Sequence, residues 1–270
     1  ASVGKLFMGA LIPGIMLGAM YILYILIASF LKKDLAPAPK NRQPLDARAW
    51  LDVLRAVLPP MALIIAVLGS IFFGIATTTE ASAVGAGGAM LMAFVSKRLD
   101  MATLKESLYQ TSRTSAFIFG IFIGATVFAS VLRGLGGDEV IESAITGLPF
   151  GTTGVLLTVL FITFLLGFFL DWVEITLIIL PLVAPVLFKM GVEPVWFAIM
   201  FAICLQTSFL TPPVGFSLFY IKGVCPPGIT TRHIYLGVLP FIALQLLALA
   251  LVFWFEPLAT WLPNEVYGGG

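Results

Sequence analysis

Three acidic residues lie between long apolar stretches of the chain, where a charge is unfavourable. Glu80, Asp171 and Glu174 each separate uncharged blocks. A charge inside a bilayer costs about 2.5–3.5 kcal/mol on insertion scales, so such residues are rare and usually functional. Each also has a plainer interpretation, as a solvated loop residue at the membrane surface. For Glu80 both interpretations stand, because Thr77–Glu80 also suits an external turn.

Asp171 separates two apolar arms, Val155–Leu170 and Ile175–Phe188. The second arm has 14 residues, which is too few to cross a hydrocarbon core of about 30 Å unaided. We therefore expect Asp171 at the tip of a re-entrant hairpin, because irregular backbone at membrane depth occurs only where it lines a cavity or is buried in protein. Glu174 is also positioned to cap the second arm, since a helix N-terminus favours a carboxylate.

Two adjacent prolines interrupt the apolar stretch Val195–Ile221. Pro212 and Pro213 lack an N–H, so the carbonyls of Ser208 and Phe209 lose their helical donors. The residue before a proline is also moved out of the α region. The sequence therefore predicts two half-helices that meet at this point.

The break between these half-helices is rich in oxygen atoms. Thr207, Ser208 and Thr211 supply hydroxyls beside the freed carbonyls, and Gly215 lets the chain resume a helix. Transporters coordinate Na⁺ at such broken helices, and hard cations prefer oxygen ligands. A proline kink that serves only helix packing is the alternative, and the residues alone do not decide between the two.

The elements that carry these residues are membrane helices. The chain is 60% hydrophobic and 11% charged, with a mean hydropathy of +1.06, whereas a soluble domain is about 45–50% apolar and 25% charged. Six apolar blocks are each long enough to cross a bilayer: Phe7–Leu31, Ala56–Thr79, Thr114–Leu132, Ser143–Leu170, Val195–Ile221 and Ile234–Phe255. The sequence predicts an all-α polytopic membrane protein.

Several function classes lack their signatures. A net charge of +1 without a basic run gives no sign of a nucleic-acid partner. Two cysteines and one histidine do not build a metal cluster by themselves. The sequence contains no P-loop, no HExxH and no nucleophile paired with a base, so we expect neither an ATP-driven pump nor an enzyme.

The connecting segments predict shorter elements. Arg48–Arg55 suits a surface helix, followed by a span that begins near Pro59 and Pro60, where a missing N–H matters little. Ala81–Ser96 is a shorter apolar run with small residues at Ala81, Gly85 and Ala89, a spacing typical of close helix packing. Asp100–Arg113 has the pattern of an amphipathic helix. The chain enters its first span within six residues, without a charged leader, which suggests a piece of a longer polypeptide.

Lysine and arginine are distributed unevenly over the connecting segments. Alternating the spans, with Ala56–Ser96 and Val155–Phe188 as paired passes, places twelve on one side and three on the other. The twelve are Lys32, Lys33, Lys40, Arg42, Arg48, Arg55, Lys97, Arg98, Lys105, Arg113, Lys222 and Arg232, against Lys5, Arg133 and Lys189. Cytoplasmic loops carry the excess of these residues, so we predict both termini on the periplasmic side of a bacterial inner membrane.

These signals divide the chain into six segments, each with an expected role. They are a first membrane span (1–31), a cytoplasmic connector (32–56), paired passes with an arm helix (57–113), a scaffold span with an external turn (114–153), a hairpin with a broken helix (154–222), and a last span with an external tail (223–270).

Several stretches together resemble the large membrane subunit of tripartite ATP-independent periplasmic (TRAP) transporters. The resemblance runs almost from end to end and corresponds to the C-terminal half to two-thirds of that subunit. One departure is Thr78, where many relatives have a proline. The similar stretches are Leu6–Leu17, Gly74–Val84, Gly167–Pro185, Gly191–Phe197, Thr211–Gly215 and Leu239–Ile242.

The resemblance implies an elevator-type secondary transporter driven by Na⁺. Its expected partners are a periplasmic solute-binding protein that delivers a small organic acid, a small four-span membrane subunit and the missing N-terminal part of the same subunit. It places the ion site at Gly167, Asp171, Thr207, Ser208, Thr211, Pro212 and Gly215, with Na⁺ held by Thr211, Ser208 and Gly167. Candidates for the solute gate are Asp171, Glu174, Thr79 and Glu80.

Two other functions remain open on sequence grounds. The first is an ion-coupled carrier of related architecture that works without a binding protein. The second is a structural or channel-like membrane protein whose broken helices are packing kinks, without Na⁺ dependence or saturable uptake.

Overall fold

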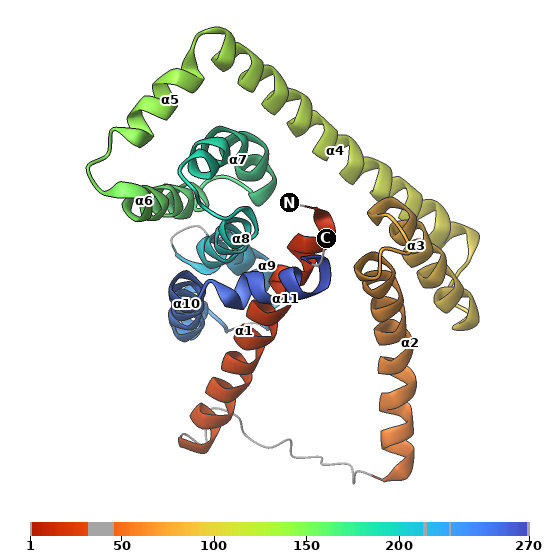
Figure 1. Cartoon of the computed structure of the whole chain (residues 1–270). Helices are drawn as coiled ribbons and strands as arrows, with labels where there is room; N and C mark the ends of the chain where they lie inside the picture. Colours follow the sequence, from red (N-terminus) through yellow and green to blue (C-terminus); the bar gives the residue numbers. More distant parts are fainter. Residues whose placement is uncertain (1, 32–45, 213–214, 227, 269–270) are drawn as a thin grey trace. The chain divides into compact units, whose positions relative to one another are not determined.

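The computed structural model describes residues 2–31, 46–212, 215–226 and 228–268 of the chain. The described residues form α-helices and contain no strand (Figure 1), which confirms the predicted all-α class. The helices are α1 (Val3–Leu31), α2 (Ala47–Phe72), α3 (Thr78–Val95), α4 (Met101–Gly134), α5 (Gly137–Thr146), α6 (Gly151–Leu166), α7 (Trp172–Lys189), α8 (Pro194–Leu210), α9 (Phe216–Val224), α10 (Thr231–Trp254) and α11 (Pro257–Tyr267).

Five helices of the described chain are long and apolar enough to cross a membrane: α1, α2, α4, α7 and α10. Two further apolar helices, α6 and α8, have 16 and 17 residues. The chain divides into two compact units. One contains Tyr24–Ser115, and the other contains Ala1–Leu23 with Ala116–Gly270, so α1 and α4 each contribute to both.

In the Tyr24–Ser115 unit, α2 pairs with α3. Small residues of α3 make the contact: a Cβ on Gly85, from the predicted row, would lie 3.3 Å from Val67 Cγ2, and the backbone of Gly88, which is outside that row, lies against the Leu63 side chain. Ala81 is fully buried. Small side chains allow this close approach of two helix backbones, so the packing role is confirmed for Ala81 and Gly85, whereas Ala89 is exposed.

The start of α2 differs from the prediction. Arg48–Arg55 is not a separate surface helix, and Pro59 and Pro60 do not start a span, because α2 runs unbroken from Ala47 with both prolines inside it. Asp46 caps it by accepting the Ala49 N–H at 2.8 Å. In membranes a proline inside a helix is tolerated where neighbouring groups satisfy the freed carbonyls, and apolar composition alone does not mark where such a helix begins.

Asp100–Arg113 is likewise part of a longer element. It continues directly into the following span as α4, a single helix of 34 residues. Asp100 starts it by accepting the Thr103 N–H at 2.7 Å, and hydrogen bonding to Thr103 holds the pKa of Asp100 below its ordinary value. The predicted boundary at Thr114 is wrong because a change from amphipathic to apolar composition does not break a helix that has no proline or glycine there.

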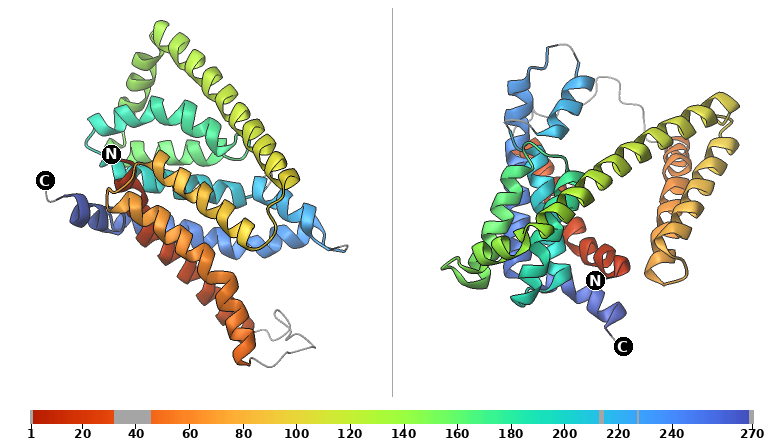
Figure 2. Two further views of the ribbon diagram at one scale, coloured as in Figure 1. Left: turned by 90° about the vertical axis from the view of Figure 1, so that its right-hand side faces the viewer. Right: turned by 90° about the horizontal axis from the view of Figure 1, so that it is seen from above.

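The larger unit is built on α8. Helices α6, α7 and α10 pack against it, and the left view of Figure 2 shows α6, α7 and α8 side by side. The core lies between these helices and includes Val155, Leu156, Ile175, Leu187 and Met200, each at most 1% exposed. Where the start of α8 meets the end of α10, the Trp196 indole N–H donates to the Val252 carbonyl at 2.8 Å.

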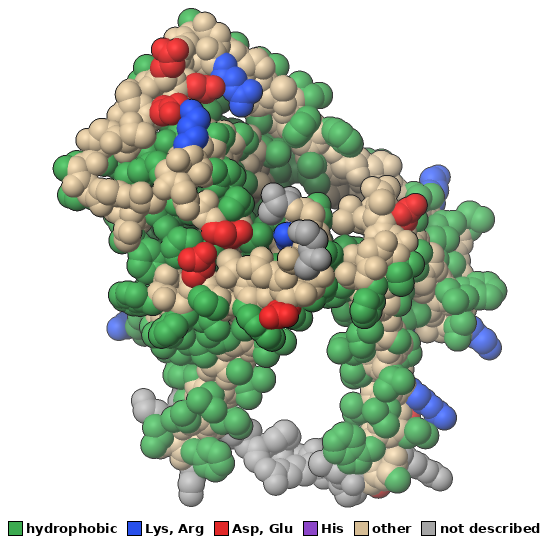
Figure 3. Space-filling view, in the orientation of Figure 1, with side chains coloured by type: hydrophobic (Ala, Val, Ile, Leu, Met, Phe, Trp, Pro, Cys, Tyr) green, Lys and Arg blue, Asp and Glu red, His purple; other side chains and the backbone are tan. Residues whose placement is uncertain are grey.

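Charged side chains gather at one end of this unit, over α5 and the adjoining end of α4 (Figure 3). Arg133 forms an ion pair with Asp138 at 3.3 Å, and Lys189, at the end of α7, forms one with Glu142 at 2.9 Å. Arg133 and Lys189 are two of the three basic residues that the positive-inside count assigns to the periplasmic side. Both pair with residues of α5, and we call this end of the unit the α5 end. Both α6 and α8 begin at this end of the unit.

Candidate functional site

Helices α6 and α7 form a hairpin whose turn is Gly167–Asp171. The turn is closed by hydrogen bonds from Gly167 N–H to the Thr163 carbonyl and from Leu170 N–H to the Leu166 carbonyl, both 2.9 Å. At 1.5 Å per residue the arms are about 24 Å and 27 Å long. The expectation of a 14-residue second arm is wrong, because Trp172, Val173 and Glu174 belong to the helix rather than to a loop.

Asp171 and Glu174 form a reciprocal cap on α7. The Asp171 carboxylate accepts the Trp172 N–H at 2.8 Å, and the Glu174 carboxylate accepts the Asp171 N–H at 3.3 Å. The capping role expected for Glu174 is thus confirmed. Asp171 is half-buried at the end of the hairpin turn, and its hydrogen bond to the backbone holds the carboxylate there.

The helix that follows is broken at the predicted place. α8 ends at Leu210 and α9 begins at Phe216. Thr211 has the extended angles φ −91° and ψ 127°, the region that a residue before proline favours. Gly215 has φ +47°, in the left-handed region that glycine enters without strain. Pro213 lies outside the described residues.

One detail of the break differs from the prediction. The Ser208 carbonyl loses its helical donor to Pro212 but accepts the Thr211 N–H instead, at 3.1 Å. Such tightening of the last turn is a usual way to satisfy carbonyls at a helix end. The Ser208 carbonyl is therefore not bare, although an oxygen with two lone pairs can accept a second partner.

Three hydroxyls line the end of α8, and each donates back into its own helix. Thr207 Oγ1 donates to the Ile203 carbonyl, Ser208 Oγ to the Leu205 carbonyl and Thr211 Oγ1 to the Thr207 carbonyl, all at 2.7 Å. Thr207 and Ser208 are fully buried. Because the hydrogens are used in the helix, the oxygen lone pairs remain to accept a donor or bind a cation.

The hairpin turn contacts the broken helix directly. The Gly167 backbone lies so close to Ser208 that a Cβ on Gly167 would overlap Ser208 Oγ and come within 2.7 Å of Ser208 Cβ. The reason lies in the chain layout: α6 and α8 both start at the α5 end and run about 16 residues in the same direction. The structure thereby brings together two of the predicted site residues, Gly167 and Ser208, with Thr207 next to Ser208 in the chain and Thr211 just after the end of α8.

A third buried hydroxyl in this region, beside those of Thr207 and Ser208, was not among the predicted site residues. Thr163 lies on α6 one turn before Gly167, and it is 0% exposed. Its Oγ1 has no hydrogen-bond partner among the described residues. A threonine inside an apolar run gives no signal by itself; only its spacing of four residues from Gly167 places it on the same helix face.

Another fully buried polar side chain lies on α10. Gln245 is 0% exposed, and the Tyr21 hydroxyl of α1 lies near its amide, but no hydrogen bond of standard geometry joins the amide to any group of the described residues. It belongs to the buried face of α10 together with Val238, Ile242, Ala248 and Val252. Val252 packs in the core around α8, and Val238 and Ile242 pack against Leu218 of α9.

Thr79 and Glu80 lie in the Tyr24–Ser115 unit, and both are exposed. Glu80 closes a capping box at the start of α3: its carboxylate accepts the backbone N–H and the hydroxyl of Thr77, both at 2.8 Å. Thr77–Glu80 is therefore the capped first turn of α3 and not a connecting turn between spans, and the gate role of Thr79 and Glu80 remains a prediction.

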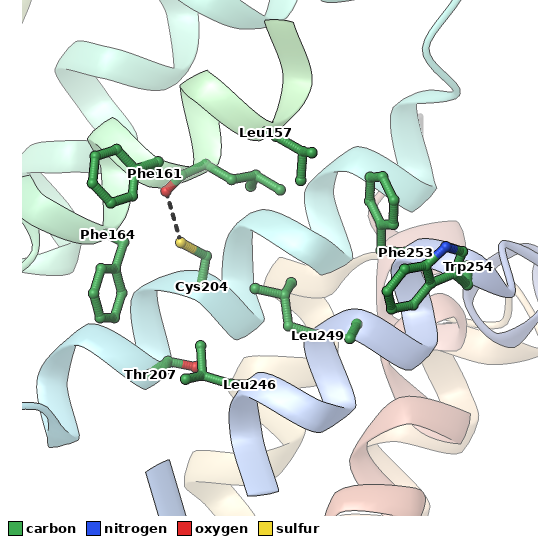
Figure 4. Close-up of a pocket in the computed structure, with 11 residues that line it drawn as sticks. Leu157, Phe161, Phe164, Cys204, Thr207, Leu246, Leu249, Phe253 and Trp254 are labelled. Carbon is green, nitrogen blue, oxygen red and sulfur yellow. Dashed lines mark hydrogen bonds between the residues drawn. The ribbon is translucent and has the colours of Figure 1, made fainter. Parts of the chain in front are cut away.

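A cavity of about 420 Å³ lies beside Thr207, between α6, α8 and α10 (Figure 4). Its wall consists mainly of leucine and aromatic side chains, with Thr207 and Cys204 from α8. The Cys204 thiol donates to the Leu160 carbonyl at 3.1 Å. A carboxylate would meet no charged group among the lining residues described, so this cavity suits apolar groups rather than an organic acid.

Comparison with known proteins now identifies the family. The profile of the tripartite ATP-independent periplasmic transporter DctM component matches residues 1–258. The chain belongs to this family. It is 30% identical over 266 residues to the C4-dicarboxylate TRAP transporter large permease protein DctM of Pseudomonas aeruginosa, covering 97% of this chain and 60% of that protein.

Other DctM-family relatives carry different substrate names. The chain is 30% identical to the isethionate TRAP transporter permease protein DctMQ of Oleidesulfovibrio alaskensis, over 92% of this chain and 38% of that protein. It is 27% identical to the sialic acid TRAP transporter large permease protein SiaM of Vibrio cholerae, over 100% of this chain and 62% of that protein. The chain thus spans about 60% of the large permeases that it matches.

Proposed function

We propose that this chain carries the second hairpin and an ion site of a Na⁺-coupled TRAP transporter that imports a small organic acid. A periplasmic solute-binding protein would deliver the solute, and a small membrane subunit would support the scaffold, as the family name and the relatives' names suggest. The observation that carries the proposal is the contact between Gly167, in the hairpin turn, and Ser208, beside the helix break.

Electrostatics at this contact favour a cation. Both α6 and α8 end there, and each helix C-terminus carries roughly half a negative charge from its aligned peptide dipoles. The buried hydroxyl oxygens of Thr207 and Ser208 supply neutral ligands. Na⁺ prefers such oxygens, and carrier proteins place half-helix C-terminal ends at their Na⁺ sites.

A helix N-terminus, in contrast to these C-termini, favours an anionic group such as the solute carboxylate. α9 begins at Phe216, and no side chain of the described residues caps it, so the N–H groups of its first turn and the positive end of its dipole would face a carboxylate bound there. Asp171 caps α7 beside the same turn and would be repelled by a carboxylate at close range. We therefore place the solute carboxylate at the α9 end, with Asp171 and Glu174 as positioning residues of the hairpin gate.

Coupling follows from the geometry. An ion bound between the turn and the broken helix orders both segments, so solute binding afterwards loses less conformational entropy. Na⁺ and solute would then raise each other's affinity by the same factor, as linkage requires. A channel-like protein with packing kinks lacks this coupling.

The test is the dependence of uptake on Na⁺ concentration in proteoliposomes that contain the intact assembly. Thr211→Ala should raise the Na⁺ concentration for half-maximal uptake more than it weakens solute binding at saturating Na⁺. Thr126→Ala is a matched control, because the Thr126 hydroxyl makes the same bond to a carbonyl four residues earlier, Phe122, at an exposed position of α4.

Two outcomes would count against the proposal. If the Na⁺ curve of Thr211→Ala matches that of wild type, its side chain is no ion ligand. If a variant with Pro212→Ala and Pro213→Ala also keeps the curve, the break is only a kink. Uptake that proceeds equally without the binding protein would instead favour an ion-coupled carrier that works alone.

A further inference from the structure

Thr163 faces the α6–α8 interface between two contacts that fix its position. One turn before it, the Leu160 carbonyl accepts the Cys204 thiol of α8 at 3.1 Å. One turn after it, Gly167 lies against Ser208 of α8. Residues three or four apart share a helix face, so Thr163 is opposite the stretch of α8 between Cys204 and Ser208, which contains Thr207.

The Thr163 hydroxyl is an anomaly in this position. Thr158, on the same helix, donates its hydroxyl to the Gly154 carbonyl at 2.8 Å, as threonines in helices commonly do. Thr163 Oγ1 makes no such bond within the described residues and is fully buried. A buried polar group without a partner is destabilising, and one in a native structure calls for a bound water or ion as its explanation.

We propose that Thr163 is a ligand of the cation bound between the hairpin and the broken helix. This inference rests on the proposed Na⁺ site and adds a ligand from the first arm of the hairpin. The ion would then be held from α6 by Thr163 and from α8 by the hydroxyls of Thr207 and Ser208. Since these side chains are neutral, the arrangement suits a monovalent ion, whereas divalent ions usually require carboxylates.

The unfolding temperature of Thr163→Val without Na⁺ distinguishes a ligand role from a packing role of the hydroxyl. It should rise if the hydroxyl is an ion ligand and fall if the hydroxyl has a structural partner. Thr163→Val replaces the hydroxyl by a methyl group of similar shape. Without Na⁺ this should raise the unfolding temperature of the full-length permease by about 2–4 °C, because an unsatisfied buried group is removed. With Na⁺ the same variant should gain less stability than wild type, because one ligand is lost.

The measurement is the unfolding temperature of the detergent-solubilised, full-length permease against NaCl concentration, with choline chloride holding ionic strength constant. In Thr163→Val the Na⁺ concentration that gives half of the stabilisation should rise at least about tenfold, because the variant loses one polar group that contacts the charged ion. Thr163→Ser, which keeps the hydroxyl, should restore the wild-type curve. Thr158→Val is the matched control and should leave the Na⁺ response unchanged.

The outcomes separate this inference from the proposed function. A wild-type Na⁺ response in Thr163→Val would overturn the ligand role of Thr163 and leave the Na⁺ site itself in place. A lower unfolding temperature of Thr163→Val without Na⁺ would also overturn it, since the hydroxyl would then have a structural partner. Absence of any Na⁺ response in wild type would overturn the proposed function.

Discussion

Gly167→Ala tests the contact between the hairpin turn and the broken helix. Gly167 has φ −64° and ψ −8°, angles that alanine adopts freely, so the substitution introduces no backbone strain. Where a site has room, glycine to alanine stabilises a protein by about 0.4–1 kcal/mol through the unfolded state. Any loss of stability at Gly167 must therefore come from the new Cβ.

The expected loss follows from the distances. A Cβ added to Gly167 would lie 2.7 Å from Ser208 Cβ and still closer to Ser208 Oγ, whereas carbon atoms pack best at about 3.5–4.0 Å. The turn must move by roughly 1 Å, and overpacking of this kind costs about 1–3 kcal/mol. We expect a net destabilisation of about 1–2 kcal/mol and a higher Na⁺ requirement for uptake, because the ligands on the two sides are pushed apart.

The assay is thermal unfolding of the full-length permease together with Na⁺-dependent uptake. Gly237→Ala on α10 is the control, because a Cβ there meets no atom within 4 Å, and it should be neutral or stabilising. Ser208→Ala combined with Gly167→Ala should recover part of the lost stability, since residues in contact are not additive. Unchanged stability and an unchanged Na⁺ curve in Gly167→Ala would refute the reasoning.

Three further predictions concern other parts of the chain. Asp171→Asn should abolish most uptake but change stability by less than about 0.5 kcal/mol, because asparagine caps a helix as well as aspartate does; near-normal uptake of a correctly inserted variant would return Asp171 to a purely structural role. Gln245→Leu should raise the unfolding temperature, since a buried amide that makes no well-formed hydrogen bond costs about 1–3 kcal/mol; a lower temperature would show that the amide bonds the neighbouring Tyr21 hydroxyl or a bound partner. Cysteines at Asn41, outside the described residues, and at Ser112 should react with a membrane-impermeant reagent only from the cytoplasm, and one at Gly136 only from the periplasm; labelling of Asn41 and Gly136 from one face would contradict the topology.

Local chemistry made some features predictable from the sequence. The break at Thr211 was predicted from two prolines together with Gly215, whose positive φ redirects the chain; two adjacent prolines alone do not break a helix, as Pro59 and Pro60 inside α2 show. The cap by Glu174 follows equally from its position three residues after Asp171. The row of small residues on α3 marked a close helix contact for the same reason, since backbone approach depends on side-chain size.

Other features depend on contacts that no local pattern reveals. The second hairpin arm was predicted too short because polar residues at its start resembled a loop, although they are the capping turn of α7. The prolines of α2 resembled a helix start but lie inside a helix. Thr163 could not be singled out, because its importance arises from the position of Gly167 against α8, a contact between segments about 40 residues apart in the chain.

The most direct test of the central claim is uptake by proteoliposomes that contain the intact assembly and its solute-binding protein. Succinate and sialic acid are suitable labelled probes, because relatives are named for a C4-dicarboxylate and for sialic acid. An inward Na⁺ gradient should drive accumulation of at least one probe above equilibrium, an equal K⁺ gradient should not, and Thr211→Ala should shift the response to higher Na⁺. Accumulation that is the same with Na⁺ and K⁺ would contradict the account.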